Sequence, residues 1–152
     1  MDYHTNDGNY VLDTLVLDLN GTLTVRGKVP YGVWWRLRRL RRRGFEVLLI
    51  TGNQRHNAAF IAHHLGITFL EAHNAHEKDL AVRRLKHKGL VAVGNARIDI
   101  PTFKHAKIAI ATLQDEGIHP DILAHVDIVV PSITAALDVL LDKDTFSATM
   151  KK

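Results

Sequence analysis

A chain of 152 residues without cysteine has neither disulfides nor thiolate metal sites, and it is long enough to bury the core of one domain. Lysine and arginine outnumber aspartate and glutamate by 20 to 16, and no apolar run approaches the ~20 residues that span a bilayer. The polar start, MDYHTNDGNY, does not resemble a signal peptide, so we expect a cytoplasmic protein with no membrane association, a flexible segment over residues 1–11 and a single domain over residues 12–152.

The first predicted element is a buried strand over residues 15–17 that ends at Asp18. Its unbroken apolar run is typical of a parallel strand that is covered on both faces. Asn20 and Gly21 favour a turn directly afterwards, because asparagine bonds its own backbone and glycine tolerates positive φ. Asp18 is therefore predicted at the carboxyl end of a strand, which is the edge where open α/β sheets bind ligands.

Residues 24–44 predict a small hairpin and then a helix. β-Branched residues flank Arg26-Gly27, which favours a hairpin over residues 24–30. Val33, Leu37 and Leu40 then recur with helical spacing, and six arginines lie among them: Arg36, Arg38, Arg39, Arg41, Arg42 and Arg43. We interpret this as an amphipathic helix with arginines on its solvent face. A nucleic-acid or acidic-partner site is the less favoured reading, because with Trp34 placed beside the apolar stripe only Trp35 is left for stacking.

The remaining chain alternates predicted strands with predicted helices. Strands are expected over residues 45–50, 67–70, 90–93, 107–111 and 127–130. Helices are expected from 52–53 to about 65, over 77–87 and 101–106, as a turn at 121–124, and from a Ser132 cap to 141. This order predicts an α/β fold, a three-layer α/β/α sandwich with a mostly parallel, Rossmann-like sheet. The intervals 24–51 and 53–78 are too short to hold a lid domain.

Four segments in register resemble the motifs of the haloacid dehalogenase-like (HAD) superfamily. Asp18-Leu19-Asn20-Gly21-Thr22-Leu23-Thr24 resembles the first motif, and the strand end at Thr51, Lys78 and the segment GNARID at 94–99 resemble the other three. The resemblance covers about residues 12–141. It implies a HAD-like fold without a cap domain, and DLNGTLT with ITGN looks like the soluble P-type ATPase-like phosphatase group. Because capless relatives often assemble, the resemblance also implies a homo-oligomer.

The resemblance also implies a set of site residues. Asp18 would be the nucleophile of phosphoryl transfer, acting on a small phosphorylated substrate with Asn20, Thr51 and Lys78 as the other catalytic positions. The phosphate would be bound by Thr51, by the amides of Gly52 and Asn53 at a helix start, and by Lys78. A Mg²⁺ ion would be held by Asp18, the main-chain carbonyl of Asn20, Asn95 and Asp99. Four histidines, His63, His64, His73 and His76, are interpreted as surface residues, not as metal ligands.

Three positions depart from the family pattern. Asn20 stands where most phosphatases of the superfamily have a second aspartate as general acid and base, and losing that work typically costs 10²- to 10⁴-fold in rate. Ala96 and Ile98 replace a glycine and an asparagine of the fourth motif, so Mg²⁺ binding should be weaker. We therefore expect a slow Mg²⁺-dependent phosphohydrolase acting on phosphate monoesters or ATP. The alternative is a catalytically degenerate phosphate-binding or scaffolding module whose arginine helix binds an acidic partner.

Overall fold

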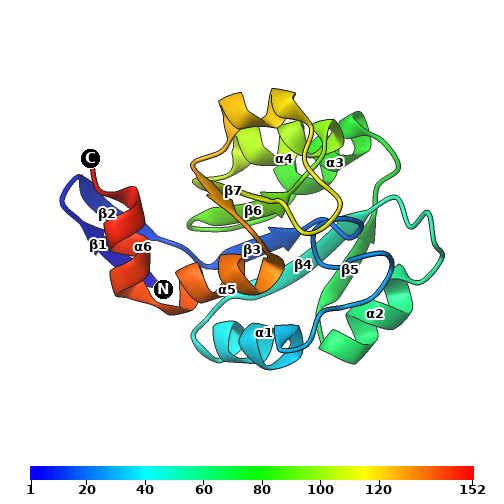
Figure 1. Ribbon diagram of the computed structural model, residues 1–152, viewed down its shortest axis with the longest axis horizontal. Helices are drawn as coiled ribbons and strands as arrows, with labels where there is room; N and C mark the ends of the chain where they lie inside the picture. The colour runs from blue at the N-terminus through cyan, green and yellow to red at the C-terminus, as the bar shows by residue number, and fades with distance from the viewer.

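A parallel six-stranded sheet forms the centre of the computed structural model, which describes residues 1–152 (Figure 1). The strand order is β5-β4-β3-β6-β7-β8, and every neighbouring pair is parallel. The bounds are β3 (Thr14–Leu17), β4 (Glu46–Thr51), β5 (Thr68–Glu71), β6 (Leu90–Gly94), β7 (Ile108–Thr112) and β8 (Ile128–Val130). The central strands β3, β6 and β7 are buried throughout, as their unbroken apolar runs predict.

Helices cover both faces of the sheet (Figure 1). One face carries α1 (Val33–Arg42), α2 (Ala58–Leu65) and α5 (Ile133–Leu141), and the other carries α3 (Ala75–Arg83) and α4 (Ile100–His105) with two short 3₁₀ turns, Arg97–Asp99 and Pro120–His125. The prediction of a three-layer, mostly parallel α/β sandwich is therefore confirmed. None of the helices combines the length and hydropathy needed to cross a bilayer.

Local signals explain where several elements begin. Ser132 caps α5 as predicted, because its hydroxyl accepts a hydrogen bond from the amide of Ala135 at 3.1 Å. Val33, Leu37 and Leu40 are the buried residues of α1. The predicted hairpin over residues 24–30 is also present, closed by two backbone hydrogen bonds between Val25 and Lys28. Only this hairpin and α1 lie between β3 and β4.

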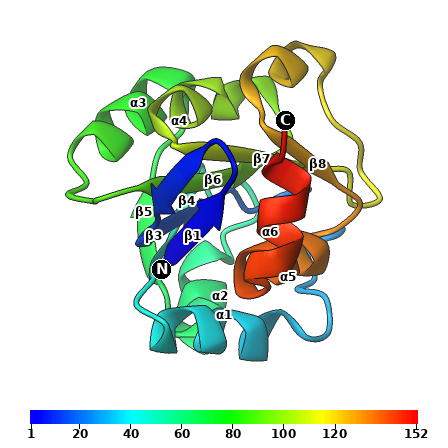
Figure 2. The ribbon, with the colours of Figure 1, turned by 90° about the vertical axis from the view of Figure 1, so that its left-hand side faces the viewer.

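The N-terminal segment, for which the sequence predicts flexibility, has regular secondary structure in this structure. Residues 1–11 contain an antiparallel hairpin of β1 (Asp2–Thr5) and β2 (Gly8–Val11), which lies beside the C-terminal helix α6 (Lys143–Met150) (Figure 2). Tyr3 is fully buried, with its hydroxyl donating to the carbonyl of Leu140 at 2.7 Å and its ring 4.4 Å from that of Phe146. The first ten residues are mostly polar, but they include one buried aromatic side chain whose partners lie at the other end of the chain.

Candidate active site

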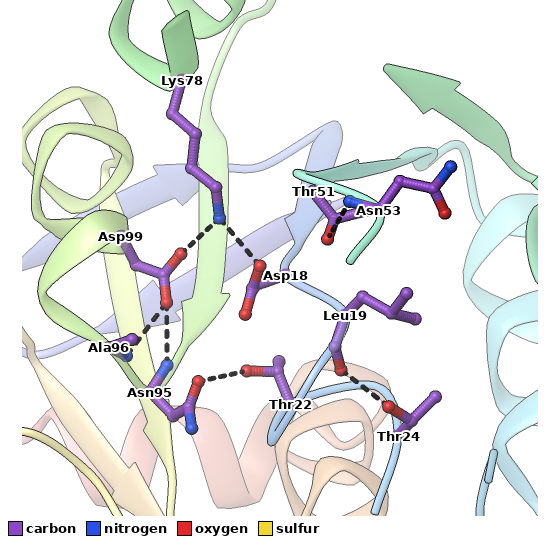
Figure 3. Close-up of polar contacts among 10 residues, drawn as sticks. All are labelled: Asp18, Leu19, Thr22, Thr24, Thr51, Asn53, Lys78, Asn95, Ala96 and Asp99. Carbon is purple, nitrogen blue, oxygen red and sulfur yellow. Dashed lines mark hydrogen bonds and ion pairs between the residues drawn. The ribbon is translucent and has the colours of Figure 1, made fainter. Parts of the chain in front are cut away.

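One buried lysine bridges two carboxylates at the carboxyl edge of the sheet. The ammonium of Lys78 lies 2.8 Å from Oδ1 of Asp18 and 2.7 Å from Oδ1 of Asp99 (Figure 3). The side chains of Lys78, Asp18 and Asp99 are 2 %, 12 % and 4 % exposed, respectively. Three residues that are far apart in the sequence, each predicted for the site, therefore meet in one contact.

Neighbouring elements bring these three groups together. Asp18 directly follows β3, and Lys78 lies on α3, whose first turn is fixed by the side chain of Asn74 accepting from the amide of Glu77. Asp99 ends the 3₁₀ turn after β6. A side chain at Gly94 would put a Cβ within 2.5 Å of the Asp99 carboxylate, so this position must be glycine for the turn to close.

The two carboxylates outnumber the lysine, and the site keeps an uncompensated negative charge. Burial, and after it the charge of Asp99, raise the pKa of Asp18 to about 6, although Lys78 opposes this shift. The pKa of Lys78 is also raised above its ordinary value, because the two carboxylates outweigh the effect of burial. One ammonium ion cannot neutralise both partners, so the site favours an additional cation beside Asp18.

Thr51 and Gly52 lie beside Asp18 at the end of the next strand. Thr51 is the last residue of β4 and is buried, and both residues line the same cavity as Asp18 and Lys78. The expected helix start at Gly52 and Asn53 is wrong, because α2 begins at Ala58. Asn53 instead adopts a positive φ of 55°. Its main-chain amide donates to the Thr51 hydroxyl at 3.4 Å, and its side-chain oxygen accepts from the main-chain amide of Ala58 at 3.0 Å. The segment expected to bind phosphate is thus a loop, without a helix N-terminus behind it.

The oxygen atoms near Asp18 fit a hard divalent cation. Asn20 lines the cavity, and its side-chain oxygen is buried without a hydrogen-bond partner. Asn95 follows β6, and its side-chain oxygen receives only a long contact of 3.4 Å from the Thr22 hydroxyl. No three His, Cys, Asp or Glu side chains of the chain are placed to hold a metal ion together, so the donors would be one carboxylate with amide and main-chain oxygens. Mg²⁺ accepts such oxygen sets and keeps part of its water shell.

Asp99 contacts other groups with both of its oxygens. Oδ1 accepts from Lys78, and Oδ2 accepts from the amides of Asn95 and Ala96, both at 3.0 Å. A carboxylate offers about four acceptor directions, so three of them are already used. These contacts favour a role for Asp99 as the counter-ion that positions Lys78. They are less favourable to the predicted direct contact of Asp99 with metal.

A cavity of about 270 Å³ opens above the triad. Its lining includes four of the predicted site residues besides Lys78, and four further residues: Gln54, His73, Ala96 and Ile98. His63, His64, His73 and His76 are all exposed, as predicted, but His73 also borders the cavity, with Nε2 3.3 Å from Oε1 of Glu71. The sequence could have indicated that His73 lies near the cavity, because it comes just after β5 and β5 ends at the same edge of the sheet as β3 and β4. Asn53, Asn95 and Asp99 do not line this cavity.

Replacing Lys78 with Met should destabilise the metal-free chain by about 3 to 5 kcal/mol, because two buried carboxylates then lose their only cation. Met keeps the aliphatic stem, so packing changes little. Urea denaturation at neutral pH in EDTA measures the loss, with Lys86→Met on an exposed lysine as the matched control. Equal stabilities of the two variants would mean that the triad does not hold the site together.

Two sequence comparisons find proteins similar to this chain. The sequence model of the haloacid dehalogenase-like hydrolases matches residues 32–107, half of the chain. An uncharacterized protein of Methanocaldococcus jannaschii is 35% identical over 65 residues, which are 43% of this chain and 70% of that protein.

Solved structures share the fold. The cobalt-bound deoxy-D-mannose-octulosonate 8-phosphate phosphatase of Haemophilus influenzae superposes with a TM-score of 0.70 at 17% identity, covering 90% of this chain and 91% of that one. The corresponding enzyme of Moraxella catarrhalis, solved with magnesium, phosphate and KDO, gives a TM-score of 0.69 at 16% identity, covering 91% and 92% of the two chains.

Proposed function

This chain belongs to the haloacid dehalogenase-like hydrolase family, and we propose that it is a slow Mg²⁺-dependent phosphohydrolase working through an aspartyl-phosphate on Asp18. The observation that carries the proposal is the buried Asp18–Lys78–Asp99 contact at the mouth of a polar cavity. A buried carboxylate in an open cavity, held by a lysine that is itself anchored elsewhere, has the features of an oriented nucleophile.

Each residue has a defined task in this proposal. An oxygen of Asp18 attacks the phosphorus, a new P–O bond forms, and the bond to the leaving oxygen breaks with its electron pair on the leaving group. Water then attacks the same phosphorus and releases inorganic phosphate and Asp18. Lys78 offsets the charge on the phosphoryl oxygens, while the Thr51 hydroxyl and the Gly52 amide hold them in place. Mg²⁺, held by Asp18, the Asn20 carbonyl and Asn95, would supply further positive charge to these oxygens.

Asn20 limits the rate in this proposal. An amide side chain can neither protonate the leaving oxygen nor take a proton from the attacking water at neutral pH. Both half-reactions then depend on solvent for proton transfer. The chain should therefore turn over slowly, even with every other group in position.

Small phosphate monoesters are the substrate class that we favour, with ATP as the second choice. Two structural neighbours are named as phosphatases of a sugar-acid 8-phosphate, and a cavity of about 270 Å³ has room for a phosphate and a few further atoms. The likeness of DLNGTLT to the soluble P-type ATPase-like group supports ATP. Assembly into a homo-oligomer would let a second copy cover this open site.

A second candidate is a phosphate-binding module without turnover. The apolar side chains of Ala96 and Ile98 line the cavity, and Asn20 supplies no acid or base there. Such a module would bind phosphate and Mg²⁺ and release no product.

Phosphate release from a panel of phosphate monoesters and ATP tests the enzymatic proposal. We expect slow release in the presence of Mg²⁺ and a fall of at least about tenfold in EDTA, because the ion offsets charge on the reacting oxygens. Release that is independent of Mg²⁺ would contradict the mechanism. Phosphate binding without any release would favour the second candidate.

A further inference from the structure

The solvent face of α1 has an unusual composition. Val33, Leu37 and Leu40 point into the core, and the exposed side chains of the helix are two tryptophans and four arginines: Trp34, Trp35, Arg38, Arg39, Arg41 and Arg42. We call these six residues the Arg/Trp face. The helix contains no acidic residue at all. An ordinary solvated helix mixes both signs of charge, so this face differs from one.

The four arginines of this face have no acidic partner. Arg36 and Arg43, at the border with α5, are engaged, since Arg36 binds Asp138 with two hydrogen bonds of 2.7 and 3.0 Å and Arg43 donates to the Leu141 carbonyl. None of the other four takes part in any ion pair of the chain. Arg38 and Arg42 are also one helical turn apart, where like charges weaken a helix. Ion pairing within the chain therefore does not explain this cluster.

The tryptophans are the second observation. Trp34 is 47 % exposed and Trp35 is 38 % exposed, so Trp34 also has accessible ring surface and Trp35 is not the only tryptophan left for stacking. The guanidinium of Arg38 lies 5.3 Å from the ring centre of Trp34, and those of Arg36 and Arg39 lie 4.3 and 5.7 Å from that of Trp35. Favourable dipole contacts at the end of the helix can account for the last arginines, but they leave the two exposed indoles unexplained.

We propose that the Arg/Trp face binds single-stranded nucleic acid, with arginines on the phosphates and tryptophans stacked on bases. Unpaired cations beside exposed aromatic rings form the combination that single-stranded chains require, because every base offers a flat face and every linkage a negative charge. An acidic protein would match the charge but would offer no bases to stack on the exposed rings. No residue of α1 lines the cavity around Asp18, so this surface is separate from the phosphohydrolase site.

Intrinsic fluorescence gives a direct readout, because Trp34 and Trp35 are the only two tryptophans of the chain. Titration with 20-nucleotide RNA and with DNA of the same length should quench their emission by stacking. Comparison of the two titrations shows whether the Arg/Trp face prefers RNA or DNA. Polyglutamate of similar charge is the comparison, and it should leave the emission nearly unchanged.

Salt dependence and matched variants complete the test. With four phosphate contacts, raising salt from about 50 to about 200 mM should weaken oligonucleotide binding by roughly 50-fold, and by only about sevenfold in the double variant Arg38→Gln, Arg42→Gln. Trp35→Ala should weaken binding by about tenfold at constant salt. The double variant Arg84→Gln, Lys86→Gln removes the same charge beyond the end of α3 and should bind like the parent.

Three results would overturn the proposal. They are no binding at the lower salt concentration, polyglutamate binding as tightly as the oligonucleotide, and equal losses in the two double variants. Phosphate release should be the same in all of these variants, because none of them alters the Asp18 cavity.

Discussion

Substitution of Asp18 with Asn is expected to reduce phosphate release by at least about 10³-fold, to the level of the assay blank. The side chain keeps its shape, and its amide oxygen can still accept the hydrogen bond that Lys78 donates at 2.8 Å. Only the nucleophilic charge is lost, so no acyl phosphate can form. The measurement is phosphate release with Mg²⁺ at equal protein concentration. Equal rates in both proteins would contradict a covalent intermediate on Asp18, since the activity would then belong to other residues or to a contaminant.

Stability measurements provide the control for that variant. Burial and the nearby Asp99 raise the pKa of Asp18 to about 6, above its ordinary value of 3.8 in an unfolded chain. The stabilising effect of this shift is complete below about pH 4 and is lost as pH rises through 6. In EDTA, the free energy of unfolding of the parent should therefore fall between about pH 4 and about pH 6.5, and Asp18→Asn should lack this fall. A well-folded variant then shows that lost activity is not lost structure.

The placement of the Asp18 site could be predicted because it follows from strand ends. Apolar runs before Asp18, Thr51 and Asn95 mark β3, β4 and β6, and parallel neighbours bring their carboxyl ends to one edge. Lys78 could be placed near that edge only by the resemblance, since its own surroundings in the sequence look like an ordinary surface helix. Its burial depends on two carboxylates, at distances of 60 and 21 residues along the chain.

The features that were missed depend on long-range packing or on loop conformation. Tyr3 is buried by Leu140 and Phe146, a contact that no local pattern in MDYHTNDGNY indicates. Gly52-Asn53 resembles a helix cap and therefore predicts a helix that begins there, whereas Asn53 has a positive φ and the helix α2 begins only at Ala58. Single residues of this kind, whose conformation is decided by distant neighbours, limit what periodicity can show.

Whereas loss of the carboxylate at Asp18 should abolish phosphate release, the introduction of a carboxylate at Asn20 should raise it. Asn20→Asp restores a carboxyl group that can protonate the leaving oxygen and then activate water, and this work typically contributes 10²- to 10⁴-fold. The structure can accept the change, because the side chain lines the cavity and its buried oxygen has no hydrogen-bond partner to lose. Asparagine and aspartate also have nearly the same shape. We expect turnover to increase by about 10²-fold or more with Mg²⁺ present.

The comparison of Asn20→Asp with Asn20→Ser separates the two candidate functions. Serine also removes the amide but offers no acid or base, so it should leave the rate near that of the parent. A large gain with aspartate alone means that every other catalytic group is in working position and that Asn20 sets the rate. No gain would mean that the defect lies elsewhere in the cavity, at Ala96 or Ile98, and the phosphate-binding module would then be the better description of this chain. Phosphate binding measured by calorimetry in both variants shows whether either change has disturbed the site itself.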